Sequence, residues 1–313
     1  MGAASGRPHL EGCREVVRAV TRLERMNLLK GLLFVSPWLV GFVVFLAYPM
    51  LYAGYLSFTE YTGFTAPEWI GVGNYIELFH DESFWKSLGN TLYYTALAVP
   101  LGVVVALVLA VAMNQKLREV AFYRTAIYLP SALPVFALSI IFIWLLNPRY
   151  GLFNLILGLF GVPPINWLGD PQWSKLSIVL VAQMGAGQFA LIFLGGLQGI
   201  PQTLYEAVEL DGATSWQKFR YITLPLISPV ILYDIMVGLG LGMQVFTPAL
   251  IMTNGGPLDS TLFYALYLYR NAFAYNRMGY AAAMSWLLLL LCIGIALVVF
   301  RWAQRWVHYE VGE

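Results

Sequence analysis

Six long runs of apolar residues alternate with short polar segments along the chain. A membrane-spanning helix needs about 20 mostly apolar residues to cross the hydrocarbon core. Six stretches reach that length: Leu32–Phe58, Leu92–Met113, Ile127–Leu146, Leu176–Leu197, Leu226–Met252 and Tyr280–Trp302. Each must be helical, because lipid offers no hydrogen-bond partner to an open backbone. The pattern predicts an all-α, polytopic membrane protein with six transmembrane helices.

The first apolar run is too long for the core of a secretory signal peptide, and no small-residue cleavage site follows it. We therefore expect it to be retained as a span. The predicted organisation is an N-terminal extension (residues 1–31), a six-helix domain (residues 32–303) and a short tail (residues 304–313).

Lysine and arginine are unevenly distributed between the segments that connect the runs. Thirteen lie in the N-terminal segment, the second-to-third and fourth-to-fifth connections and the C-terminal end, against five in the other connections. Positive charge favours the cytoplasmic side of a membrane. Both termini are therefore predicted to be cytoplasmic, which agrees with an even number of spans.

Composition supports a membrane protein and argues against several other classes. Hydrophobic residues make up 59 % of the chain and charged residues 11 %, whereas soluble domains carry roughly a quarter charged residues. A net charge of +1 without a basic face gives no reason to expect nucleic acid as a partner. We find no metal-ligand spacing and no catalytic cluster, and Cys13 and Cys292 are not expected to pair.

The polar connection from Gly199 to Ser228 has its own helical pattern. Thr203 precedes Glu206 by three residues, which is the spacing of a capping box and predicts a helix start. We expect two short helices joined at Gly212, with Pro225 marking the start of the fifth span. On these residues alone, a surface hairpin that only connects two spans explains the pattern equally well.

Fixed spacing within this loop points to a known family. Glu206 and Ala207 are followed by Gly212 and then, after nine intervening residues, by Ile222 and by Leu224 with Pro225. The loop resembles the Glu-Ala-Ala, Gly, Ile-x-Leu-Pro signature of permease subunits in bacterial ATP-binding-cassette importers. Val208 stands where that family usually has alanine. The Asp-Gly-Ala and Leu-Pro-Leu segments resemble the carbohydrate branch, of the maltose or glycerol-3-phosphate type.

The resemblance implies a permease fold in the bacterial cytoplasmic (inner) membrane, with no catalytic site of its own. In such importers the permease forms half of the translocation pathway beside a second, homologous permease chain, and a heterodimer is expected. Two cytoplasmic ATPase subunits would bind ATP and Mg²⁺, because this chain has no Walker A sequence and is expected to bind no cofactor. An extracytoplasmic solute-binding protein would deliver a sugar or related carbohydrate.

The same resemblance assigns the loop at residues 199–228 to ATPase coupling. The residues expected to take part are Glu206, Ala207, Asp211, Gly212, Ala213, Leu224 and Pro225. A glycine allows a bend that other residues resist, and a proline restricts the backbone where the loop meets the span.

Polar residues inside the predicted spans are candidates for the substrate path. They are Gln183, Gly185 and Gln188 in the fourth span, and Asp234, Gln244 and Thr247 in the fifth. We expect Gln244 and Thr247, three residues apart, to share a helix face, and Gln244 to contact the solute, because an amide both donates and accepts. An ion pair or water contact near the cytoplasmic mouth explains Asp234 better than sugar binding. The glycines at Gly238, Gly240 and Gly242 fit helix packing as well as a path.

An ion-coupled secondary transporter is the alternative function. Such a transporter carries coupling residues at the bilayer midplane and usually a repeated half. Asp234 is the single acidic residue within the predicted spans, and no internal repeat is evident. This alternative also leaves the Glu206-to-Pro225 loop unexplained.

Overall fold

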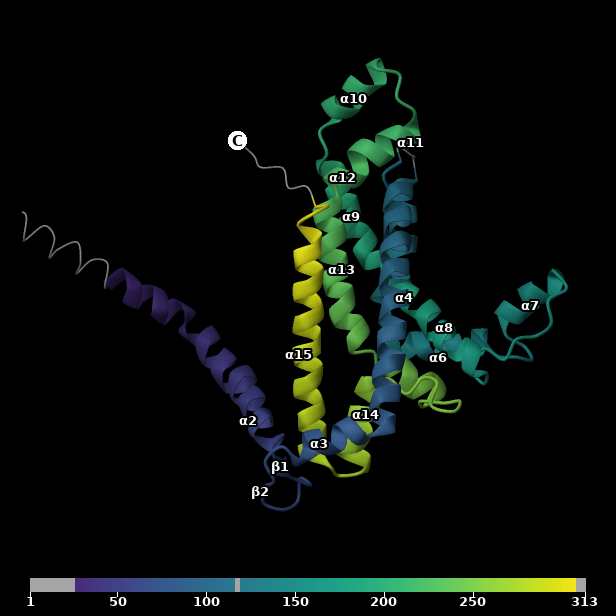
Figure 1. Ribbon diagram of the computed structural model, residues 1–313. Helices are drawn as coiled ribbons and strands as arrows, with labels where there is room; N and C mark the ends of the chain where they lie inside the picture. Colours follow the sequence, from purple (N-terminus) through teal and green to yellow (C-terminus); the bar gives the residue numbers. More distant parts are fainter. Residues whose placement is uncertain (1–25, 116–118, 308–313) are drawn as a thin grey trace, which may run out of the picture. The chain divides into compact units, whose positions relative to one another are not determined.

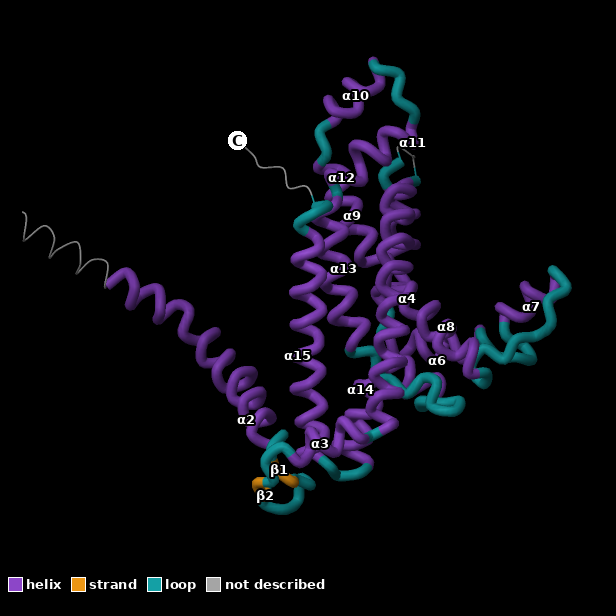
Figure 2. The backbone as a smooth tube through the Cα atoms, in the orientation of Figure 1, coloured by secondary structure: helices purple, strands orange, loops and turns teal. Residues whose placement is uncertain are grey.

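The computed structural model describes residues 26–115 and 119–307, which are mostly helical (Figures 1 and 2). Four helices in these ranges are long and apolar enough to cross a membrane: Met26–Leu56, Glu82–Met113, Pro171–Gly199 and Met278–Ala303. Two bent pairs pass the same test together, Ala121–Ala132 with Val135–Leu145 and Ser215–Leu226 with Ser228–Met243. Counted as one span each, they bring the total to six, as the hydrophobic pattern predicts.

The chain divides into two units, Met1–Leu56 and Ser57–Glu313. The described part of the first unit is the span Met26–Leu56, which includes a π-helical turn, η1 (Val43–Ala47), followed by α2 (Tyr48–Leu56). Most of its apolar side chains are exposed within its own unit. Residues 1–25, which make up most of the predicted N-terminal extension, lie outside the described residues. Residues 308–313 of the tail do so too.

The second unit begins with a two-stranded antiparallel ribbon, β1 (Thr59–Glu60) and β2 (Glu68–Trp69). It continues through a series of helices, many of which are labelled in Figure 1. In order these are α3 (Gly73–His80), α4 (Glu82–Met113), α5 (Val120–Ala132), α6 (Val135–Leu145), α7 (Leu152–Leu159), α8 (Pro171–Ala182), η2 (Gln183–Gly185), α9 (Ala186–Gly199), α10 (Gln202–Leu210), α11 (Ser215–Lys218), η3 (Phe219–Thr223), α12 (Leu224–Leu226), α13 (Ser228–Met243), η4 (Ala249–Thr253), α14 (Tyr264–Tyr269), η5 (Arg270–Ala274) and α15 (Met278–Ala303).

Helix α4 is the central element of this unit and packs against both α9 and α13. Alanines on its inner face, including Ala106 and Ala110, meet Ala190 and Phe193 of α9 in a buried cluster. Small residues let helix axes approach closely, which is how helices associate where lipid removes most of the hydrophobic drive. Gly187 gives the clearest example, because a Cβ there would lie 2.5 Å from the Ile127 carbonyl oxygen of α5.

Helix α4 begins ten residues before the predicted start at Leu92. Its first turns are polar, and Asp81 caps them by accepting a hydrogen bond from the backbone N–H of Ser83 at 2.9 Å. Ser87 and Asn90 in these turns are buried by neighbouring protein. A count of apolar residues locates lipid-facing helix and therefore misses this extension.

Two predicted spans are not continuous helices. The third breaks between α5 and α6 with a bend of 96°. Leu133 there is extended, as the residue before a proline prefers to be, and Pro134 precedes the new helix. The fifth was predicted to run to Met252, but α13 ends at Met243 and Gln244 lies at its C-cap. Another bend, of 62°, separates Leu226 from Ser228.

We predict that Gly187→Ala lowers the melting temperature of the purified chain, while Gly195→Ala on the same helix does not. Overpacking costs about 1–3 kcal/mol, and the new methyl at position 187 would meet the backbone of α5. At Gly195 a Cβ finds no atom within 4 Å. Thermal unfolding of the two variants in one detergent checks this, and equal melting temperatures would contradict the close contact.

Candidate functional site

A cavity of about 430 Å³ lies in the second unit, where one predicted span breaks, another ends early and a third tightens into a 3₁₀ turn. Its walls include the α5–α6 break, the 3₁₀ turn η2 between α8 and α9, and the C-terminal end of α13. Broken helices at membrane depth are tolerated where the freed backbone lines a protein cavity. The position of the breaks therefore marks this cavity as the candidate site.

All six residues predicted for the substrate path line this one cavity: Gln183, Gly185, Gln188, Asp234, Gln244 and Thr247. The reason given for pairing two of them is wrong, because α13 ends before Gln244 and Thr247 begins another helical segment. They are neighbours around a helix end and do not share a helix face. Aromatic side chains of Tyr94, Phe189 and Phe246 also line the cavity, and the search for polar residues missed them.

Asp234 is the one charged side chain among the residues that line the cavity. It is 5 % exposed. Within residues 26–115 and 119–307, no lysine, arginine or histidine pairs with it and its Oδ2 has no hydrogen-bond donor. The expected ion pair is therefore not found in the described part of the chain.

Two of the three glutamines that line the cavity, Gln183 and Gln244, already bond to the backbone. The Gln183 side-chain amide donates to the Val179 carbonyl at 3.0 Å and to the Ala98 carbonyl of α4 at 3.5 Å, while its Oε1 has no described donor. The Gln244 amide donates to the Gly240 carbonyl at 3.0 Å. In both side chains the amide N–H group donates to a backbone carbonyl, and the amide oxygen remains available to another partner.

Two of the three glycines in α13 take both of the roles considered for them, helix packing and lining of the path. A Cβ at Gly238 would lie 3.2 Å from Val99, and one at Gly242 would lie 2.9 Å from Thr95, so both allow α13 to approach α4 closely. Gly240 has no such neighbour. Gly238 and Gly242 also line the cavity, so each of them both packs against α4 and forms part of the cavity wall.

The loop between α9 and α13 forms the expected pair of short helices, at one end of the unit (Figure 1). Gly212 joins them with φ +79°, a left-handed conformation that favours glycine. The N–H of Ala213 closes this turn by donating to the Val208 carbonyl at 3.0 Å. The predicted bend at Gly212 is confirmed.

The predicted capping box at Thr203 and Glu206 is wrong. Pro201 occupies the N-cap of α10, and no side chain caps that helix. The capping box lies instead at α11, where Thr214 and Gln217 bond reciprocally to each other's backbone N–H. Since Pro201 sets the backbone before α10, its first turn begins at Gln202 and Thr203 falls inside the helix.

Two contacts make the loop a folded hairpin. Lys218 of α11 pairs with Glu209 of α10, and the hydroxyls of Tyr205 and Thr223 lie 2.8 Å apart. The tip exposes most of the residues predicted for coupling, with Glu206, Ala207, Asp211 and Gly212 exposed and Ala213, Leu224 and Pro225 partly buried. Two apolar side chains that the motif search missed are also exposed there, Leu210 at 91 % and Trp216 at 70 %.

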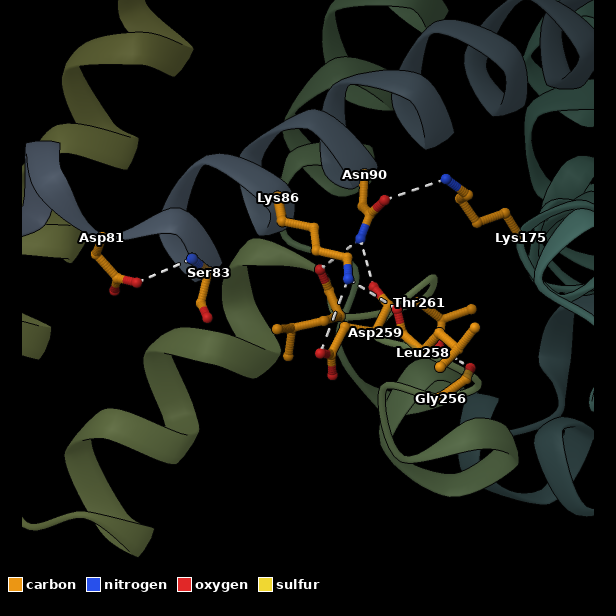
Figure 3. Close-up of polar contacts among 10 residues, drawn as sticks. Asp81, Ser83, Lys86, Asn90, Lys175, Gly256, Leu258, Asp259 and Thr261 are labelled. Carbon is orange, nitrogen blue, oxygen red and sulfur yellow. Dashed lines mark hydrogen bonds and ion pairs between the residues drawn. The ribbon is translucent and has the colours of Figure 1, made fainter.

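At the opposite end, polar contacts hold residues 254–262 against α4 (Figure 3). Lys86 donates to the Leu258 carbonyl at 2.8 Å and lies 3.9 Å from the Asp259 carboxylate. Asn90 donates to the Asp259 carbonyl at 2.8 Å and accepts from Lys175 of α8 at 3.1 Å. The segment begins with left-handed turns at Asn254 and Gly255, in agreement with the turn signal in the sequence.

Asp81 joins three helices at this end. Its carboxylate accepts hydrogen bonds from Tyr267 of α14 and from Tyr280 of α15, the second at 2.7 Å. Burial alone raises the pKa of Asp81, but these bonds and that from Ser83 outweigh it and leave the pKa below its ordinary 3.8. Burial and then the bond to Asp81 raise the pKa of Tyr267 to about 12.

The fold and the cavity define an integral membrane transport subunit. The family described as "Binding-protein-dependent transport system inner membrane component" matches residues 98–309, and the chain belongs to it. It is accordingly a multi-pass component of the inner membrane. The family is one of permease subunits and not of enzymes.

Several relatives share most of the chain. It is 39 % identical to the Bacillus subtilis protein named "Probable ABC transporter permease protein YesP", covering 94 % of this chain and 96 % of that one. It is 34 % identical to the lactose transport system permease protein LacF of Rhizobium radiobacter, covering 90 % and 97 %. In a crystal structure of a bacterial ABC transporter that imports the acidic polysaccharide alginate, one chain is similar with a TM-score of 0.77, at 26 % identity and with coverage of 92 % and 99 %.

We predict that Asp81→Ala lowers the melting temperature of the purified chain by about 4–8 °C. Hydrogen bonds to a charged acceptor contribute about 1.5–3 kcal/mol, and the variant leaves two tyrosine hydroxyls without their acceptor. Glu77→Ala in α3 is the matched control, because its ion pair with Arg277 is exposed and contributes little. Equal shifts in the two variants would show that Asp81 does not join the helices.

The same contacts predict a pH window for stability. Because the pKa of Asp81 is lowered, its contribution is present above pH 3.8 and is lost as the pH falls through the lowered pKa. The contribution of Tyr267 is present below pH 10 and is lost as the pH rises through about 12. The gap in melting temperature between the wild-type chain and Asp81→Ala should stay constant from about pH 5 to pH 9 and shrink in acid. A gap that persists unchanged at pH 2 would contradict the assignment.

Proposed function

We propose that this chain is the permease subunit of an ATP-driven sugar importer and forms half of its translocation pathway. The convergence of six polar and glycine positions on one cavity, beside two helix breaks and a 3₁₀ turn, carries this proposal. The transported class follows from relatives named for lactose, trehalose and maltose, and arabinooligosaccharides. The other half of the pathway would come from a second, homologous permease chain, making a heterodimer.

The exposed hairpin of α10 and α11 is the proposed contact with two ATPase subunits, which would bind ATP and Mg²⁺. Glu206 and Asp211 offer carboxylates for charge-assisted hydrogen bonds, and Leu210 and Trp216 offer apolar area for burial. The excess of lysine and arginine supports a cytoplasmic location for this end, for both termini and for the loop at residues 199–228. A solute-binding protein would then dock at the opposite end, where α3 and residues 254–262 lie; a complex with such a protein is described for the alginate transporter.

Helix α13 connects the hairpin to the cavity. It begins just after Pro225 and the 62° bend, carries Asp234, Gly238 and Gly242 along the cavity wall, and ends at Gln244. A helix moves as a rigid rod, so displacement of its loop end is carried to its other end. Movement of the ATPase subunits would therefore change the shape of the cavity without a separate relay.

Affinity purification of the tagged chain from its native membrane, with mass spectrometry of the proteins that come with it, tests the proposal. We expect an ATPase with a Walker A sequence and a second six-span chain. An ion-coupled secondary transporter built around Asp234 is the alternative. Recovery of the chain alone, in a form that still transports, would establish that alternative.

We predict that Gly212→Val reduces uptake at least tenfold in the assembled importer, while Gly212→Asn retains most of it. The left-handed φ of +79° suits glycine, is tolerated by asparagine and is strained for a β-branched residue. Membrane insertion should be equal, because the position lies outside the spans. Uptake by cells with matched membrane levels of each variant measures this, and equal uptake would mean that the geometry of the turn is not needed for coupling.

A further inference from the structure

The charge within the cavity is unbalanced. Asp234 is 5 % exposed, and the other residues that line the cavity are apolar or neutral. No described lysine, arginine or histidine lies within ion-pair distance of its carboxylate. An ionisable side chain at this depth is costly unless it meets a partner, and such residues mark solute or ion pathways.

The cavity is also rich in hydrogen-bond acceptors. Asp234 Oδ2 and Gln183 Oε1 are two buried acceptors for which the described chain supplies no donor. Both residues line the same cavity, and Gly102 of α4 lies beside the Gln183 oxygen. Buried acceptors without donors cost free energy, so a solute that brings donors would be favoured there.

The remaining lining suits a sugar ring. Tyr94, Phe189 and Phe246 present aromatic surface, and a volume of about 430 Å³ falls within the range of small-molecule sites. Apolar walls with a few polar groups are typical of such sites. The neutral walls leave Asp234 to set the preference for charge.

We propose that this cavity selects neutral or cationic hydroxyl-rich solutes and excludes anionic ones, such as uronates and sugar phosphates, through the carboxylate of Asp234. The inference rests on the proposed function, because it names the class of solute for that same site. Hydroxyl or ammonium donors satisfy the two acceptors, whereas an anion meets like charge in a medium of low dielectric. The solute would then differ in charge from those of relatives named for glycerol-3-phosphate and sulfoquinovosyl glycerol, and from the acidic polysaccharide of the similar alginate transporter.

The charge preference can be measured with paired thiol reagents. In the transporter as it purifies from the native membrane, reconstituted in lipid nanodiscs with Cys13→Ser and Cys292→Ala as background, Gln188→Cys places a thiol in the cavity lining. Its labelling rates with trimethylammonium-ethyl and sulfonatoethyl methanethiosulfonate give a cation-to-anion ratio. We expect Asp234→Asn to lower this ratio about tenfold or more. Leu258→Cys, 81 % exposed at the opposite end, is the control, and its ratio should not change.

An unchanged ratio at position 188 would overturn the proposal, because Asp234 would then be neutralised by a group on another chain. A fall in both ratios would overturn it too, since it would indicate a change in the whole assembly. Labelling reports the charge in the cavity whatever drives transport, and the purification reports the partners. A chain that purifies alone but shows the expected ratio would therefore refute the importer and retain the charge preference.

Discussion

The need to satisfy every backbone polar group inside the protein is the constraint on which this structure depends. A lipid-facing helix cannot be interrupted, because its freed N–H and C=O groups would have no partner. The breaks at Leu133–Pro134 and after Met243, together with the 3₁₀ turn η2, are all found around one cavity. Side chains satisfy some of the backbone groups near these positions, since the amides of Gln183 and Gln244 donate to nearby carbonyls. The helix breaks are tolerated because they line a cavity within the protein, and the cavity is formed where the helices break.

The two ends of the unit are held together in different ways. At the end of α3, the carboxylate of Asp81 and the amide of Asn90 fasten α14 and residues 254–262 to α4. At the other end the α10–α11 hairpin is folded within itself through Lys218 and Glu209, and its tip is exposed. A hairpin that keeps its own shape yet exposes Trp216 is suited to engage a partner as a rigid body, consistent with the proposed coupling.

Features that depend on composition and residue spacing were predicted from the sequence. Features that depend on contacts with neighbouring elements were missed. The spans follow from the thickness of the hydrocarbon core, and the bend at Gly212 follows from its place between two short helices. The early start of α4 was missed because Asn90 is buried by protein. The capping box was misplaced because Thr203 has the right spacing, but Pro201 already starts the helix. The breaks that form the cavity carry only a weak signal, the residue-before-proline rule at Leu133.

Asp234 is the clearest case in which the sequence pattern and the structural surroundings of a residue lead to different expectations. In the sequence an acid two to three turns after Pro225 fits an ion pair near the cytoplasmic mouth. In the structure the α13 glycines draw that helix against α4, with Gly238 facing Val99, and this packing buries the carboxylate beside the cavity. The partner of such a group cannot be deduced from α13 alone, because the neighbouring helices decide which charges reach it. The described neighbouring helices bring no positively charged side chain to Asp234, and its carboxylate is therefore available to a solute that enters the cavity.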